Sequence, residues 1–267
     1  ITLQGKFIYR EICDTKIAWD TELEGDVRKR WMLWEKSTPL TVTTPRPIAP
    51  HQEAIKEIHL HAFGDASGKG VSAAVYGVSK QDSGNTQLLI AAKSRLAKRG
   101  LTIPRLELIA GHMAVNLISN VANAIGEERI TSQHCWLDST VALYWIEGAG
   151  EYRQFVANRV AKIRSHTNVK WHHVPTDQNP ADLGSRGGQL TEMWHKGPIW
   201  LESEENWPES PILQSSNETQ AEAKIVRELL CTAKENAESE DFEKILQKHE
   251  LRRTLRVTAW ILRFVYN

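Results

Sequence analysis

The chain is poor in cysteine and contains no hydrophobic run that is long enough to cross a bilayer. Three cysteines occur in 267 residues, at Cys13, Cys135 and Cys231, and no two of them form a Cys-x-x-Cys pair. Their wide spacing argues against a disulfide framework or a cysteine zinc site, and it favours buried thiols in a reducing compartment. No apolar run approaches the roughly 18 residues that a transmembrane helix needs, so we expect no membrane partner.

The chain also lacks a charge excess of either sign, because 33 basic residues balance 33 acidic ones. Nucleic-acid binding therefore cannot be inferred from total charge, and any basic surface must be local. This balance argues against a simple DNA-coating protein, but not against a nuclease whose acidic metal site offsets a basic groove. The chain begins at Ile1 without a signal-peptide pattern, so we expect a piece of a longer chain.

Composition changes along the chain predict four regions. Residues 1–50 predict helices followed by a linker, since four prolines lie between positions 39 and 50. Residues 57–188 have the pattern of a folded domain. Residues 189–217 predict a Trp- and Pro-rich strap on the domain surface, continuing into a polar, mobile linker over 213–222. Residues 218–267 predict further helices, over 218–231 and 242–266.

The pattern of residues 57–188 predicts an α/β fold. Runs at 58–63, 70–78 and 87–93, separated by short turns, predict three antiparallel strands. A helix over 102–125, a strand ending at Leu137, two helices and a strand over 169–174 follow. The order β-β-β-α-β-α-α-β predicts a mixed five-stranded sheet with helices on both faces, flanked by helical segments.

Four acids occupy positions that packing alone does not favour. Asp65 follows a hydrophobic strand, Glu107 lies in the first turn of an apolar helix, Asp138 ends an apolar strand, and Asp182 begins a short helix. Singly, each fits a turn or helix-cap role. Together, at one end of a sheet, their repulsion would be relieved by divalent cations, and oxygen ligands suit Mg²⁺ or Mn²⁺. Two such ions can activate a water for phosphodiester hydrolysis.

Six short motifs occur around these acids in a fixed order. They are HAFGDAS (61–67), AKSR (92–95), LTIPRLEL (101–108), WLDST (136–140), FVANRV (155–160) and HVPTDQNPADL (173–183). Together they resemble the ribonuclease H domain of BEL/Pao-type LTR retrotransposon polyproteins. The resemblance implies the ribonuclease H fold and an endonuclease that hydrolyses the RNA strand of RNA–DNA hybrids during reverse transcription. It also implies that Asp65, Glu107, Asp138 and Asp182 hold two Mg²⁺ ions, which Mn²⁺ can replace.

The flanking segments agree with this resemblance. Residues 1–50 resemble the connection segment at the end of a reverse transcriptase, and residues 218–267 resemble the lead into an integrase zinc-binding module. The resemblance implies a polyprotein slice whose partners are RNA–DNA hybrid and the adjoining reverse transcriptase and integrase modules. It implies a cytoplasmic location in virus-like particles, and a nuclear one with a pre-integration complex.

The sequence departs from the family pattern at one position. Many ribonucleases H have a histidine in the loop before the last Asp, where it helps product leave. Here that loop, residues 175–179, has none, and His172 and His173 lie earlier, on the strand. Either the enzyme works without this histidine or it is slow.

Cations and small polar residues near the acids are candidate substrate contacts. Basic side chains there can neutralise phosphates, and small polar groups can read the 2′-OH of RNA, although a solvated charged surface explains the cations equally well. The candidates are Ser67, Gly68, Lys93, Arg95, Arg105, Ser139, Thr140 and Arg186.

Three other functions stay open at this level. Asp138-Ser139-Thr140 resembles half of an aspartic-protease signature, but Val141 stands where that signature has Gly. An integrase core has a similar sheet, but its Glu comes last, on a late helix. The main alternative is a catalytically inert ribonuclease H-like domain that acts in nucleic-acid binding or polyprotein scaffolding.

Overall fold

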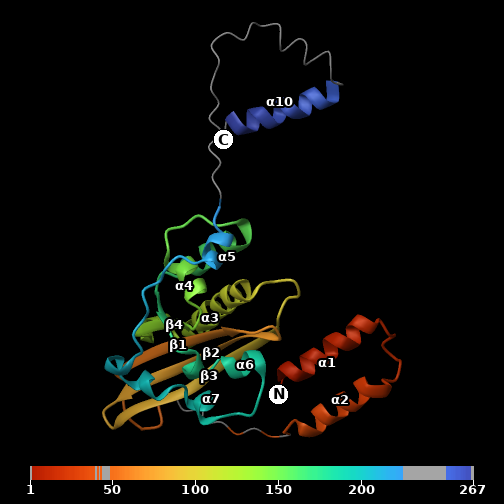
Figure 1. Ribbon diagram of the computed structural model, residues 1–267. Helices are drawn as coiled ribbons and strands as arrows, with labels where there is room; N and C mark the ends of the chain where they lie inside the picture. Colours follow the sequence, from red (N-terminus) through yellow and green to blue (C-terminus); the bar gives the residue numbers. More distant parts are fainter. Residues whose placement is uncertain (1, 40, 42, 44–48, 225–250, 266–267) are drawn as a thin grey trace. The chain divides into compact units, whose positions relative to one another are not determined.

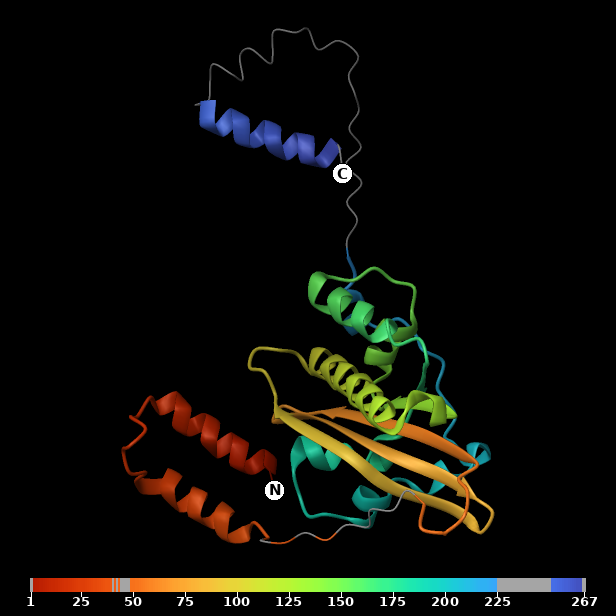
Figure 2. The same cartoon turned by 180° about the vertical axis from the view of Figure 1, so that it is seen from behind.

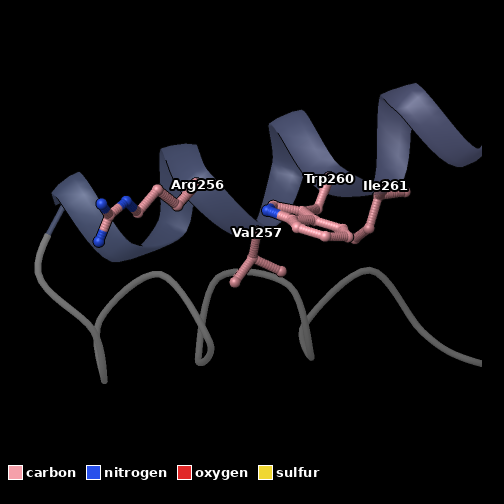
Figure 3. Close-up of a pocket in the computed structure, with 4 residues that line it drawn as sticks. All are labelled: Arg256, Val257, Trp260 and Ile261. Carbon is pink, nitrogen blue, oxygen red and sulfur yellow. The ribbon is translucent and has the colours of Figure 1, made fainter. Parts of the chain in front are cut away.

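A computed structural model describes residues 2–39, 41, 43, 49–224 and 251–265 (Figure 1). The chain divides into two compact units, residues 1–224 and 225–267. The described part of the second unit is one helix, α10 (Leu251–Val265). Figure 3 shows Arg256, Val257, Trp260 and Ile261 projecting from it. The remainder of the helices expected over 218–231 and 242–266 lies outside the described residues, apart from the short helix α8 (Asn217–Ala221) in the first unit.

Five strands form one mixed sheet in the order β3-β2-β1-β4-β5. Strands β1 (Glu57–Ala66), β2 (Gly70–Gln81) and β3 (Gly84–Leu96) are antiparallel neighbours. Strands β4 (Ser132–Leu137) and β5 (Val169–His173) continue the sheet in parallel from β1. The predicted mixed five-stranded sheet is confirmed. The third strand is longer than expected, because β3 pairs with β2 from Gly84 at the hairpin to Leu96.

Helices α3 (Ile103–Ile125), α4 (Thr140–Glu147) and α5 (Gln154–Arg164) lie on one side of the sheet (Figures 1 and 2). A Cβ at Gly64 would lie 2.8 Å from Leu137 and 3.0 Å from the backbone of Ala110, so glycine allows α3 to lie close to β1. By length and composition α3 is also the one helix among the described residues that could cross a membrane. Polar residues interrupt its sequence, so it contains no uninterrupted apolar run of that length. Its apolar side chains, such as Leu108 and Ile118, are buried in the core.

The opposite face is covered by short elements and by the tryptophans of the strap. Helices α6 (Asp182–Arg186) and α7 (Glu192–Lys196) are followed by the 3₁₀ turns η3 (Ile199–Glu202) and η4 (Glu204–Asn206). Trp194, Trp200 and Trp207 pack on a second core that contains Phe63 and Trp136. Helices therefore cover both faces of the sheet, as predicted.

Three histidines from neighbouring strands, of which His61 and His134 are buried and His172 is half-buried, stack beneath this strap. The rings of His61 (β1) and His134 (β4) are stacked at 5.1 Å, and His134 Nδ1 shares a 3.0 Å hydrogen bond with His172 Nε2 (β5). Trp207 packs edge-on, 4.7 Å from His134. Burial, the largest cause, lowers the pKa of His134 to about 3 and of His172 to about 4, and it lowers the pKa of His61 well below 6.5. We call these three residues the histidine cluster.

Helices α1 (Thr2–Thr15) and α2 (Gly25–Ser37) form a hairpin that docks on the edge of the sheet. Lys6 Nζ donates to the Ser94 carbonyl at 2.7 Å, and Arg10 Nη1 donates to the Ala97 carbonyl at 2.8 Å. These cations satisfy carbonyl groups at the exposed edge and end of β3, where another chain would otherwise pair. The hairpin therefore belongs to the same compact unit as the sheet.

The segment that leads out of this unit is anchored, contrary to the expected mobile linker over 213–222. Leu213 packs on the main core, and the Ser216 hydroxyl accepts from Thr219 N–H at 3.3 Å to cap α8. Glu222 is buried, and its carbonyl accepts from Arg153 N–H at 2.7 Å. Polar composition suggested mobility here, but the local cap of α8 and the contacts of Leu213 and Glu222 with distant residues anchor the segment.

Candidate active site

Asp65 and Asp138 leave adjacent parallel strands side by side. The register pairs Gly64 of β1 with Leu137 of β4. Asp65 is the residue after Gly64, and Asp138 is the residue after Leu137. Asp65 is 3% exposed. Asn179 fixes the loop that returns to this point, because its Nδ2 donates to the Gly64 carbonyl at 3.0 Å. The parallel pairing of β1 and β4 thus brings together two acids that are 73 residues apart.

The third acid, Asp182, opens α6, and this helix also supplies its neighbours. The Ser185 hydroxyl donates to Asp65 Oδ2. Arg186 forms an ion pair with Asp182 Oδ1 one turn earlier on the same helix. That oxygen is buried and has no hydrogen bond of good geometry in the structure, so the ion pair alone offsets its charge.

Glu107 reaches the site through Ser139. It is the fifth residue of α3, one position beyond the first turn where it was expected, because the helix begins at Ile103. The Ser139 hydroxyl donates to Glu107 Oε2 and accepts from Ala142 N–H at 3.1 Å. Ser139 therefore caps α4 and also links Glu107 to the residue that follows Asp138.

Burial and mutual repulsion disfavour the ionised forms of these acids. Burial raises the pKa of Asp65 to about 7, Ser185 opposes the rise, and Asp138 and Asp182 add to it. Burial also raises the pKa of Glu107 and of Asp138, and these two carboxylates repel one another. Asp65 is therefore coupled to Asp138 and Asp182, and Glu107 to Asp138, while the convergence of all four acids on one ion stays a prediction.

The donor set fits a divalent cation in its chemistry. All four acids offer oxygen ligands, and a cation would offset their repulsion and the buried Oδ1 of Asp182. In the described part of the chain, however, no three His, Cys, Asp or Glu side chains lie close enough together to hold an ion. Asp65 is turned toward Ser185, Glu107 toward Ser139, and Asp182 toward Arg186.

The residues predicted to contact substrate fall into two groups, and the first lies beside the acids. Ser67 donates to the Ser185 carbonyl at 2.8 Å, so its hydroxyl also fixes the β1–β2 turn. Gly68 is exposed, with open space where a Cβ would lie. Ser139 and Arg186 contact the acids directly, and Thr140 is exposed at the first residue of α4.

The second group of predicted contacts lies away from the acids. Lys93 and Arg95 are exposed on the edge strand β3. Arg105 is occupied: its Nε donates to Glu222 Oε1 at 2.6 Å, and its guanidinium lies 4.9 Å from the Phe155 ring centroid. The prediction that Arg105 binds phosphate is therefore not supported in this arrangement, since Glu222, 117 residues later, already neutralises it.

Several groups that act on the acids were not predicted from the sequence. Ser185 and Thr176 donate hydrogen bonds that lower the pKa values of Asp65 and Asp138, respectively. His173 also lowers the pKa of Asp138, and Glu218 of α8 raises that of Glu107. The spacing of Ser185, three residues after Asp182, was the one usable signal, because such residues share a helix face.

Residues 1–139 match a family model described as the Pao retrotransposon-like RNaseH-like domain. The chain is also similar to the crystal structure of ribonuclease H1 from Halobacterium salinarum, with 21% identity, 49% of this chain and 95% of that chain covered, and a TM-score of 0.33. LC11 ribonuclease H1 in complex with an RNA/DNA hybrid gives 17% identity, coverage of 49% and 94%, and a TM-score of 0.34. A foamy viral protease-reverse transcriptase in complex with double-stranded DNA gives 13% identity, coverage of 64% of this chain and 28% of that chain, and a TM-score of 0.43. No curated protein matches.

Proposed function

The chain belongs to the family of Pao retrotransposon-like RNase H-like domains, and on that premise we propose that it is an endonuclease that hydrolyses the RNA strand of RNA–DNA hybrids. The observation that carries the proposal is the pair of acids at the ends of β1 and β4. Asp65 and Asp138 lie side by side, and both are coupled electrostatically to Asp182. Glu107 completes the set through its repulsion with Asp138.

In this proposal Asp65, Glu107, Asp138 and Asp182 bind divalent cations, Mg²⁺ or Mn²⁺, which when bound supply an activated water and stabilise the leaving oxygen. The chain's own groups prepare these acids. Because the pKa of Asp65 is about 7, this carboxyl is partly protonated at neutral pH, and a bound cation would keep it ionised. Ser185 and Ser139 hold two of the carboxylates by hydrogen bonds until a cation competes for them.

Substrate selection in this proposal falls to the groups at the rim of the site. Arg186 is exposed and lies against Asp182, where it can meet a phosphate beside the reacting one. Gly68 and Thr140 offer exposed backbone and a hydroxyl for the 2′-OH of RNA. We extend the proposal to the chain's setting, with reverse transcriptase and integrase modules as neighbours and with virus-like particles in the cytoplasm, and then the nucleus, as its location.

The alternative is a catalytically inert domain that binds nucleic acid or serves as a polyprotein scaffold. It is favoured by one observation: among the described residues no three potential ligands are gathered within reach of one ion. The two candidates predict opposite responses to divalent cations, so both can be tested on the same protein.

The deciding experiment is cleavage of a labelled RNA–DNA hybrid with Mg²⁺ or Mn²⁺, comparing the wild type with Asp138→Asn. Asp82→Asn is a matched control, because Asp82 lies in an exposed turn paired with Lys56. We expect cutting of the RNA strand alone, lost in Asp138→Asn and kept in Asp82→Asn. A folded wild-type protein that cuts with neither ion would eliminate the nuclease and leave the inert domain.

Cation binding can be measured without any substrate. A ligand that binds the folded state at about 100 times its Kd stabilises that state by about 2.7 kcal/mol. We expect Mn²⁺ to raise the melting temperature of the wild type and of Asp82→Asn, but not of Asp65→Asn. Without metal, Asp65→Asn should melt higher than the wild type, because it removes a buried carboxylate that Asp138 and Asp182 repel.

A further inference from the structure

A groove runs between the α1–α2 hairpin and the end of α6. Its main part, about 970 Å³, is lined by residues that include Phe7, Leu33, Lys69, Arg186 and Leu190. A second hollow of about 350 Å³ shares Leu190 and the Gly187–Gly188 pair with the first and extends to Lys93 on β3. We call these two hollows together the hairpin groove.

The walls of the hairpin groove are held in place by contacts between the hairpin and the sheet. Leu3 is 5% exposed, and a Cβ at Gly70 would lie 2.7 Å from it, so α1 sits directly on the start of β2. Lys6 and Arg10 add hydrogen bonds to β3 and to the residue after it, and Arg99 pairs with Asp14 at the far end of α1. The groove is therefore a feature of the folded unit.

The charge of the groove fits a polyanion. Among the described residues that line it, four are cations, Arg30, Lys69, Lys93 and Arg186, and none is acidic. Arg30 is already paired with Glu11 and Asp26, and Arg186 with Asp182. This concentration contrasts with the zero net charge of the whole chain, so the positive charge here is local, as binding to phosphates requires.

The groove is continuous with the candidate active site. Arg186, in its wall, forms the ion pair with Asp182. Lys69, in the same wall, belongs to the turn whose Ser67 donates to the Ser185 carbonyl. A strand that reaches the acids from this side would therefore pass these two cations first.

Its size and lining fit one strand better than a duplex. A volume near 970 Å³ is that of a small-ligand pocket, enough for nucleotides of a single strand. Proteins that bind single strands combine such a cationic groove with aromatic and apolar side chains. Phe7 is 40% exposed and Leu33 is 67% exposed along this groove. Gly187, with φ +82° and open space at its Cβ position, lets a strand approach the backbone closely.

We propose that the hairpin groove binds a single-stranded nucleic-acid segment that continues from the hybrid at the candidate active site. The site would then recognise a junction between hybrid and single strand, with the duplex at the acids and the tail between the hairpin and α6. This inference rests on the proposed function for the position of the hybrid. The binding of the tail itself can be measured separately.

The test uses the full chain carrying Asp138→Asn, so that RNA is not cut, and fluorescence anisotropy with a labelled 12-nucleotide RNA. Phe7→Ala and Lys69→Gln alter the groove. Trp19→Ala and Lys36→Gln are matched controls, because both residues are exposed on the hairpin and neither lines the groove. We expect Phe7→Ala to weaken binding about 5-fold or more, the loss typical of one stacked base, Lys69→Gln to weaken it by more than about 2-fold through loss of a phosphate contact, and each control by less than about 2-fold. Lys69→Gln should also reduce the salt slope by about 0.7, one phosphate contact.

Two outcomes would overturn the proposal. The first is an affinity for the 12-nucleotide RNA that is the same in the protein with an unaltered groove as in the groove variants. The second is concentration-dependent self-association in sedimentation that Leu33→Ala abolishes while RNA binding is unchanged, which would assign the groove to a second copy of the chain. Hybrids with and without a single-stranded tail, offered to the wild-type protein, separate this proposal from the proposed function. Tail-dependent binding without cleavage would support single-strand binding in the hairpin groove and reject the nuclease. Cleavage that does not depend on a tail would support the nuclease and reject single-strand binding in the groove.

Discussion

Acidification should destabilise the protein through the histidine cluster. His61 and His134 are buried and His172 is half-buried beneath Trp207, and desolvation lowers the pKa of each below its ordinary value near 6.5. In the unfolded chain these histidines bind protons as the pH falls through 6.5, while in the folded chain they stay neutral. Because the unfolded state then binds more protons, the free energy of unfolding falls with the pH. The loss begins near pH 6.5 and ends near pH 3 to 4 for His134 and His172.

The loss in the free energy of unfolding depends on how far the pH lies below the unfolded pKa of the histidines. At pH 5, a histidine that is neutral in the fold and has an unfolded pKa near 6.5 costs about 2 kcal/mol. Neighbouring charges modify this value: Lys170 disfavours protonation of His134 and His172, and Glu204 favours that of His172. The raised pKa of Asp65, about 7, acts in the opposite direction, because the fold then binds the extra proton. The total pH dependence is therefore a difference of opposing contributions, and a variant is needed to isolate the histidines.

The assay is urea unfolding followed by tryptophan fluorescence at pH 7.5 and pH 5, for the wild type and His134→Gln. Glutamine keeps hydrogen-bonding groups near Ser132 and His172 but does not titrate. We expect the stability lost between the two pH values to be about 2 kcal/mol smaller in His134→Gln than in the wild type. His51→Gln, at an exposed position, should behave as the wild type does. An equal loss in His134→Gln and the wild type would refute the reasoning.

Three further changes test the packing around the site. Gly184→Ala places a Cβ 2.0 Å from the Ser72 hydroxyl, so α6 must shift. We expect hybrid cleavage to fall at least 10-fold while the far-ultraviolet circular dichroism stays unchanged, and an unchanged kcat would contradict this. Trp207→Ala opens the strap over the histidine cluster and should cost about 3 kcal/mol in urea unfolding, whereas a cost below about 1 kcal/mol would mean that the strap is not anchored there. Glu222→Gln weakens the ion pair with Arg105 and should increase hydrogen exchange over residues 217–224, while protection there equal to the wild type would show that the ion pair does not hold α8.

Much of the central fold was predictable because its signals are local. The run 58–63, ended by Gly64-Asp65, has the alternation of a strand and a turn, and the structure extends it to Ala66. The helix that follows Asp138 was likewise predictable locally, although Ser139, and not the expected Asp138, caps α4. The order of these elements, together with the motifs around the acids, was enough for the mixed sheet.

The unpredicted features all depend on residues that are distant in sequence. The histidine cluster needs β1, β4 and β5 in one register, so His61 on its own resembled an ordinary strand residue. The residues around Arg105 in the sequence favoured a phosphate contact, but Arg105 instead forms an ion pair with Glu222, which lies 117 residues later in the chain. The docking of α1 on β3 joins Lys6 to Ser94, 88 residues apart. Periodicity carries no information about such pairs, because it reports which face of an element is apolar and not what covers that face.

The five residues of α6 explain why a displacement of this helix should impair the candidate active site and the hairpin groove together. Asp182 begins the helix, Ser185 holds Asp65 one turn later, and Arg186 faces the hairpin groove. Gly184 brings this helix so close to β2 that no side chain fits between them. The helix is too short to be stable on its own, since isolated helices below about 12 residues are marginal, so its position depends on these contacts. A displacement of α6 would therefore move one acid, the hydrogen-bond donor of a second acid and a groove cation at once, and hybrid cleavage and single-strand binding should be lost together.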